Sequence, residues 1–92
     1  MTNDEYAARN IMQWPEKLGG WVTPEGFIDR AFWKPSEDRN QLAQVCREVR
    51  VWANENDCPD IKLTVRRAWA DAEYDPGAAL DIIMKAHKES EE

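Results

Sequence analysis

A chain of 92 residues with a formal net charge of −6 is long enough for one domain and too short for two. Hydrophobic residues make up 42% and charged residues 33%, a balance typical of a folded protein rather than a disordered one. No stretch approaches the roughly 20 apolar residues that span a bilayer. Net acidity argues against direct binding to a nucleic-acid backbone, which needs clustered Lys and Arg. We expect a single domain over 1–92, with an ordered core over 4–87 and a frayed tail over 88–92.

The cysteines and the N-terminus predict an intracellular protein. Cys46 and Cys58 are the only cysteines, which fits reduced thiols of the cytosol rather than a disulfide scaffold. The first five residues, Met1-Thr2-Asn3-Asp4-Glu5, lack the basic-then-apolar order of a signal peptide. A chain this short depends on economical packing or on self-association, so a homo-oligomer remains an alternative to a monomer.

The N-terminal segment predicts a short helix. Thr2 and Glu5 have the spacing of a capping box. Pro15 disfavours helical geometry at Trp14, so we expect the helix to stop there. The apolar face of this helix comprises Ala7, Ala8, Ile11 and Met12.

A hairpin and a long helix are predicted next. Residues 21–23 and 27–29 have strand composition and flank a Pro-x-Gly turn at 24–26. Ser36 is the expected cap of the long helix, which ends in the turn-forming run 54–59. Its apolar stripe repeats at intervals of three and four and comprises Leu42, Val45, Cys46, Val49, Trp52 and Ala53.

The C-terminal third predicts a strand and a last helix. Alternating apolar residues, the pattern of a half-buried strand, stand at Ile61, Leu63 and Val65. The phase breaks at Arg66-Arg67, and 68–74 is compatible with a bulge, another strand or a short helical piece. Asp75-Pro76 reads as the cap and first position of a helix. That helix is expected to bury Ala79, Ile82, Ile83 and Ala86.

These elements predict an α+β fold in the order α-β-β-α-β-α. Because each helix has one apolar face and the strands are short, we expect three helices packed on a small, mainly antiparallel sheet of three or four strands. The expected architecture is a layered sandwich.

Short motifs give the chain a family resemblance. They are Ile11-Met12-Gln13-Trp14 at the end of the first helix, Gly20-Trp21 at the hairpin, Trp33-Lys34-Pro35-Ser36 before the second helix, and Pro76 leading into an alanine-containing helix. With them, the chain resembles the phage ABA sandwich domain family, small proteins of phages and prophages, over roughly Asp4 to Lys88. The segment between the second and third helices is shorter than in the family, which leaves the strand count there open. The resemblance implies an α/β/α layered fold and a phage origin, but no activity and no catalytic residues.

No catalytic, cofactor or metal site is expected from the residue pattern. The only histidine, His87, is expected to be a solvated residue or a C-terminal helix residue, near a fraying end where a nucleophilic triad would be poorly held. Cys46, Cys58 and His87 lack the close spacing of zinc ligands. The glycines are scattered rather than gathered in a phosphate loop.

Aromatic and basic residues supply the candidate binding site. Trp14 and Trp52 are expected in the core. For Trp21, Trp33 and Trp69 two alternatives stay open, burial in the core or contact with a partner, because interfaces favour Trp. The basic run Arg66-Arg67, with Lys62 and Lys34, is the one candidate for an anion site, and ordinary surface charge is the alternative. The candidate partner- or anion-binding residues are Trp21, Trp33, Lys34, Lys62, Arg66, Arg67 and Trp69.

The expected function is binding rather than catalysis. We expect a small phage accessory protein that inhibits a host protein of antiviral defence, in the cytoplasm of the infected bacterium. One alternative is an oligomeric sponge that sequesters a nucleotide signal, and another is a virion or assembly component. A membrane partner is not expected.

Overall fold

The computed structural model of the protein describes residues 1–91 of the chain. Their elements are α1 (Asn3–Tyr6), a π-helical turn η1 (Ala7–Ile11), β1 (Glu16–Lys17), β2 (Gly20–Thr23), β3 (Gly26–Asp29), α2 (Arg39–Glu55), α3 (Pro59–Asp71) and α4 (Pro76–Glu91). The described chain is α+β, with four α-helices and one three-stranded antiparallel sheet. The predicted class is therefore confirmed. The predicted count of three helices, and the strand between the last two of them, are wrong.

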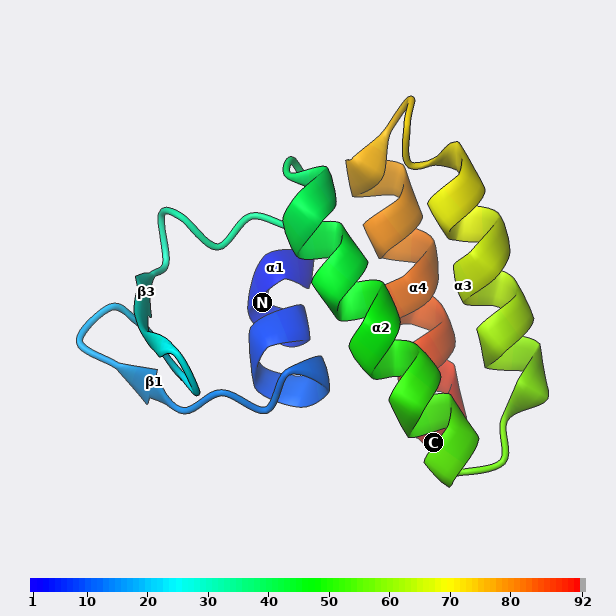
Figure 1. The fold of residues 1–92 in the computed structure, drawn as a ribbon, viewed down its shortest axis with the longest axis horizontal. Helices are drawn as coiled ribbons and strands as arrows, with labels where there is room; N and C mark the ends of the chain where they lie inside the picture. The colour runs from blue at the N-terminus through cyan, green and yellow to red at the C-terminus, as the bar shows by residue number, and fades with distance from the viewer. Residues whose placement is uncertain (92) are drawn as a thin grey trace.

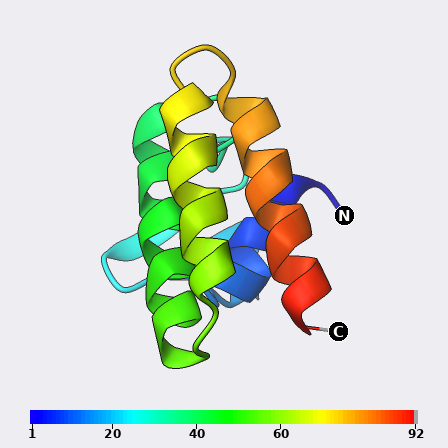
Figure 2. The ribbon, with the colours of Figure 1, turned by 90° about the vertical axis from the view of Figure 1, so that its right-hand side faces the viewer.

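The three long helices lie side by side, and each runs antiparallel to the next (Figures 1 and 2). α3 packs against both α2 and α4. α1 and η1 lie on the other side of α2 and α4, and the sheet lies beyond them, at the opposite end of the molecule from α3 (Figure 1). The helices therefore pack mainly on one another, so the arrangement differs from the layered sandwich that the sequence predicts.

The N-terminal helix begins as predicted. The Thr2 hydroxyl accepts a hydrogen bond from the Glu5 backbone N–H at 3.2 Å, which confirms the cap. Ala7, Ala8 and Ile11 are buried as expected. The helical turns end at Ile11, before the position expected from Pro15, because the chain already turns at Gln13, whose φ of 58° lies in the left-handed region.

The hairpin of β2 and β3 also follows the prediction. Trp21 pairs with Ile28 and Val22 pairs with Phe27, across a turn in which Gly26 has a φ of 135°. The sequence did not predict β1, a two-residue strand that pairs with the start of β2. Because neighbouring side chains of a strand point to opposite faces, Trp21 faces inward and is buried while Val22 and Phe27 are exposed.

Gly20 on β2 is required by a close approach of β3. A Cβ at this position would lie 2.3 Å from the Phe27 ring and 2.4 Å from the Ile28 carbonyl oxygen. We expect Gly20→Ala to lower the free energy of unfolding by about 1–3 kcal/mol, as overpacking does. Urea denaturation followed by circular dichroism measures the loss.

Gly20→Ala combined with Phe27→Ala separates the two clashes. The ring is then absent but the Ile28 carbonyl oxygen remains, so the double variant should recover only part of the loss. An unchanged stability of Gly20→Ala would contradict the close approach.

The long helix α2 starts later than predicted. Its cap is Asp38, whose carboxylate accepts hydrogen bonds from the backbone N–H groups of Asn40 and Gln41. Ser36 instead binds Asp4, and both its N–H and its hydroxyl donate to that carboxylate at 2.9 Å. The predicted apolar stripe is confirmed: Leu42, Val45, Cys46, Val49 and Ala53 are buried and Trp52 is partly buried.

α3 replaces the predicted strand at 61–65. Of the alternatives left open for 68–74, the helical one holds as far as Asp71, and 72–74 form a turn. Its buried residues are Ile61, Val65 and Ala68, and the buried C-cap Ala72 continues their helical intervals of three and four. Ile61 and Val65 are four residues apart, so they suit both the strand period of two and the helical period of about 3.6. Leu63 distinguishes a strand from a helix, because only a strand would bury it with them, and it is 45% exposed. Pro59 at the start of the helix, after Cys58 as its N-cap, was the helical signal that the alternation obscured.

α4 begins as predicted and buries a wider face. The Asp75 carboxylate accepts a hydrogen bond from the Ala78 N–H at 3.1 Å. Ala79 and Ile83 are buried, but Ile82 is 48% exposed and Ala86 is only partly buried. The face instead includes Leu80, Met84 and His87, since α4 packs against α1, α2 and α3. The helix continues to Glu91, beyond the core end expected at 87, and Glu92 lies outside the described residues.

Candidate binding site

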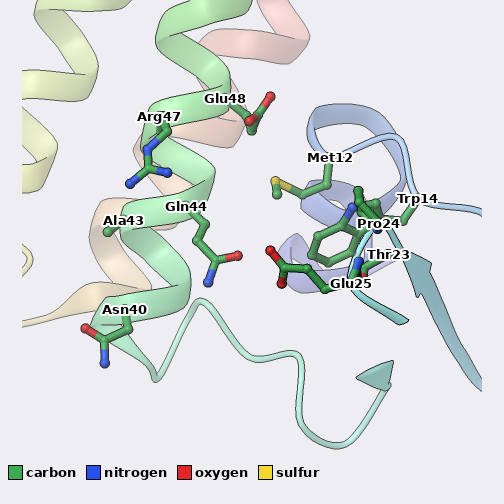
Figure 3. A pocket seen from close by; sticks show the side chains of 10 residues that line it. All are labelled: Met12, Trp14, Thr23, Pro24, Glu25, Asn40, Ala43, Gln44, Arg47 and Glu48. Atoms are coloured by element: carbon green, nitrogen blue, oxygen red, sulfur yellow. Dashed lines mark hydrogen bonds between the residues drawn. The ribbon is translucent and has the colours of Figure 1, made fainter. Parts of the chain in front are cut away.

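A broad groove separates the hairpin turn from one face of α2 (Figure 3). Its volume is about 720 Å³. Gln44, Arg47 and Glu48 project from the α2 side, whereas Glu25 approaches from the hairpin turn (Figure 3). Met12 and Trp14 form the apolar end, and the remaining lining residues are Thr23, Pro24, Asn40 and Ala43. Amide, carboxylate and guanidinium groups together suit hydrogen bonds to a polar segment of a partner.

A second feature is the outer face of the hairpin, which is apolar and exposed. Leu18 is 90% exposed and Phe27 is 55% exposed. With Val22 and Lys17, they line one shallow hollow of about 380 Å³. We call Leu18, Val22 and Phe27 the hairpin apolar face. Contiguous exposed apolar residues of this kind mark interaction surfaces more often than isolated ones do.

A third feature is a narrower groove between α2 and α3, with a volume of about 340 Å³. Basic and aromatic side chains from both helices line it, namely Arg47, Arg50, Arg66 and Trp69, over a floor of Ala43, Cys46 and Val65. Arg47 lines the broad groove as well, so it separates the two grooves along α2.

The structure brings only two of the candidate binding residues, Arg66 and Trp69, together in one groove. Arg67 is exposed and lies outside the lining of that groove. Lys62 lies on α3 rather than on a strand, and its ammonium donates to the Asn54 side-chain oxygen. Lys34 is exposed and 3.5 Å from the Glu37 carboxylate. The predicted basic cluster is therefore split over separate surfaces.

Two of the candidate tryptophans, Trp21 and Trp33, are buried in the core. Trp21 is covered by the guanidinium groups of Arg9 and Arg30, which lie 5.6 and 5.5 Å from its ring centre. Both arginines also bind one oxygen of Glu16 at 2.6 Å, so a cation–π and ion-pair network covers the ring. Neither tryptophan is accessible to a partner in this conformation.

Sequence reasoning missed the arginines of α2 that face Arg66 and Trp69. Arg47 and Arg50 are not among the predicted binding residues, because the sequence predicts a strand at 61–65, the segment that lies across the groove from them. The missed signal is the helical spacing of Pro59 to Asp71, since two adjacent antiparallel helices would have brought these basic residues together.

The buried thiol of Cys46 is held in its protonated form. Burial raises the pKa of the Cys46 thiol to about 11, against the opposing charge of Arg50. The thiol therefore stays protonated near neutral pH, and the thiolate is the reactive form. His87 lies elsewhere, with its Nδ1 at 2.7 Å from the Tyr6 hydroxyl.

His87 lies near the C-terminal end of α4, as one of its two expected placements has it, but it is buried rather than solvated. Trp52 packs on its ring at 4.5 Å between ring centres, and Tyr6 meets it edge-on at 5.7 Å. Its Nε2 is 3.4 Å from a Glu91 carboxylate oxygen but makes no hydrogen bond within the described chain. Desolvation lowers the pKa of His87, and Glu91 opposes the shift. Across residues 1–91, no group of three or more His, Cys, Asp or Glu side chains is arranged to hold a metal ion.

Comparisons of the chain with models of known protein families, with curated proteins and with solved structures gave no match. Among the described helices, none combines the length and the apolar character needed to cross a membrane.

Proposed function

We propose that this chain is a phage accessory protein that acts by binding, and that it inhibits a host protein of antiviral defence. The observation that carries the binding role is the hairpin apolar face. Val22 and Phe27 form a cross-strand pair on the exposed side of the sheet, and Leu18 extends the pair into a single apolar hollow. Apolar and aromatic side chains of this kind supply most of the affinity at protein interfaces.

The hairpin is well placed to reach a partner. It lies at one end of the molecule, beyond α1, so a protein surface can approach it without meeting the long helices (Figure 1). Within residues 1–91, β3 pairs only with β2, so its other edge has no strand partner there and is a place where an extended segment could bind. The charged residue that lines the hollow is Lys17, so the complementary partner combines an apolar recess with an acidic group beside it. The setting in the cytoplasm of an infected bacterium rests on the phage resemblance of the sequence.

A plaque assay tests this proposal. Phage plating is measured on bacterial strains that each carry one defence system, with and without expression of the chain. We expect the wild-type chain to restore plating on at least one strain. The variant with Val22→Asp and Phe27→Asp should lose that protection at least about tenfold, because buried charges replace the apolar contacts.

Leu63→Asp is the matched control, because Leu63 is also a half-exposed apolar residue but lies on α3. It should protect as well as the wild-type chain. Thermal melts establish that all variants are folded. Equal protection by the hairpin variant and the wild type would exclude the hairpin apolar face as the binding surface. Failure to restore plating on any strain would remove the support for an anti-defence role.

A further inference from the structure

Basic and aromatic side chains from two helices, α2 and α3, converge on the groove between them. On α2, Arg39, Ala43, Arg47 and Arg50 follow one another at intervals of four, four and three, so they form a single stripe along the helix. On α3, Arg66 and Trp69 are three residues apart and share a face. Packing of α2 against α3 places the two stripes on either side of the groove.

These arginines have no anionic partner among residues 1–91. Arg39, Arg47, Arg50 and Arg66 form no salt bridge and donate no side-chain hydrogen bond there, although the chain has 18 acidic residues. Arg9 and Arg30, by contrast, share the Glu16 carboxylate. Guanidinium groups gathered around a small groove repel one another, and a phosphate bound between them would remove that repulsion and form charge-assisted hydrogen bonds.

Trp69 gives the groove a flat apolar wall. The Arg39 guanidinium lies 5.1 Å from the ring centre of Trp69, and this contact holds the partly buried indole in place. Below it, Cys46 and Val65 form an apolar floor. A ligand that matches both halves of the groove carries an anionic group for the arginines and a planar ring for the indole.

We propose that this groove binds a nucleoside phosphate, with the phosphate between Arg47, Arg50 and Arg66 and the base against Trp69. The groove volume of about 340 Å³ fits a single small molecule, since ligand sites range over roughly 300–1,000 Å³. A groove of this volume is too small for several nucleotides of a polynucleotide. The site is independent of the proposed inhibitory function because it lies between α2 and α3, and none of its lining residues belongs to the hairpin apolar face (Figure 1).

Titration calorimetry with adenosine diphosphate as the probe tests the site. Arg66→Glu reverses a charge on the rim of the groove, and Arg67→Glu makes the same change at the next residue, which does not line it. We expect Arg66→Glu to weaken binding by at least about tenfold, the size expected for loss of a hydrogen bond to a charged group. Arg67→Glu should stay within about threefold, because exposed charges outside the site are screened by salt.

Three further measurements discriminate the ligand class. Pyrophosphate should bind more weakly than adenosine diphosphate, because it lacks the base, and Trp69→Leu should reduce adenosine diphosphate to the pyrophosphate level. Equal affinities of the two ligands for the wild-type chain would overturn the nucleoside assignment even if Trp69→Leu fails to fold. A single-stranded oligonucleotide that binds more tightly than adenosine diphosphate would indicate a nucleic-acid surface and overturn it too.

The proposal also fails if Arg66→Glu and Arg67→Glu weaken binding equally, since the effect is then diffuse electrostatics. The proposal fails as well if millimolar adenosine diphosphate gives no binding heat in calorimetry and no rise in the melting temperature. A ligand that binds the folded state must raise that temperature. Phage plating with Arg66→Glu separates the two proposals, because loss of nucleotide binding leaves the hairpin apolar face intact.

Discussion

Trp33→Ala is expected to lower the free energy of unfolding by about 3–5 kcal/mol, the range for truncating a large buried aromatic. Trp33 is 2% exposed and packs edge-on against Trp14 at 4.7 Å between ring centres. Its indole N–H donates to the Asp4 backbone carbonyl at 2.9 Å. Small domains are stable by only about 5–15 kcal/mol, so this one side chain accounts for a large share of the total.

The neighbouring residue gives the matched control. Phe32 is 73% exposed, and Phe32→Ala should change stability by less than about 0.5 kcal/mol. Trp33→Phe retains an aromatic ring but loses the N–H donor, so it should fall between the two. Urea denaturation followed by circular dichroism gives all three values. Similar stabilities of Trp33→Ala and Phe32→Ala would show that Trp33 does not join α1 to the segment before α2.

Acidification is expected to destabilise the folded chain through His87. The imidazole is buried between Tyr6 and Trp52, so adding a proton places a charge in a desolvated site. Glu91 is the facing carboxylate and opposes the shift, but it is half-exposed and does not offset the burial. Lys88, whose ammonium lies 4.6 Å from the ring centre of Tyr6, adds a second positive charge nearby.

The sign of the effect follows from proton linkage. The unfolded chain binds the His87 proton with a pKa near 6.5, whereas the folded chain has a lowered pKa. As the pH falls below that value, the unfolded state takes up a proton that the folded state does not. The free energy of unfolding then decreases with a slope of up to about 1.4 kcal/mol per pH unit. The decrease ends below the folded pKa, and the full contribution is present above the unfolded pKa.

Denaturation curves from pH 8 down to the acid limit of folding measure this slope, with His87→Leu as the control that lacks the titrating group. Hydrogen bonding by Arg9 lowers the pKa of Glu16, so that carboxylate acts in a separate window, below its ordinary value of 4.5. Its contribution is lost only as the pH falls through its own folded pKa. Identical pH profiles for the wild type and His87→Leu would contradict the role assigned to His87.

The elements that sequence reasoning predicted well are those with local signals. The hairpin has a Pro-x-Gly turn, and its register follows from that turn and the alternation of Trp21 and Val22. The apolar stripe of α2 repeats over several turns, so its period is unambiguous. The cap of that helix was misplaced because Ser36 binds Asp4, an interaction over 32 positions that no local pattern contains.

The candidate site was only partly predictable. Arg66 and Trp69 were selected for their chemistry, and they do share a groove, but Arg47 and Arg50 come from a different helix. Trp21 and Trp33 were chosen by the same chemical preference, yet the core buries them. Residue type indicates what a side chain is able to bind. Whether that side chain is exposed depends on which other segments pack over it, and those segments are distant in the sequence.

The sequence by itself determined the α+β class, the helix caps at Thr2 and Asp75, the hairpin and the buried stripe of α2, because turn chemistry and i, i+4 spacing involve near neighbours. Only the tertiary structure decided that 59–71 is a helix, because the spacing of Ile61 and Val65 suits a strand as well. It also decided the burial of His87 beside Tyr6, 81 positions away, and the convergence of arginines between α2 and α3. Burial and convergence depend on contacts between distant segments, and these form only when the apolar faces of the helices pack together.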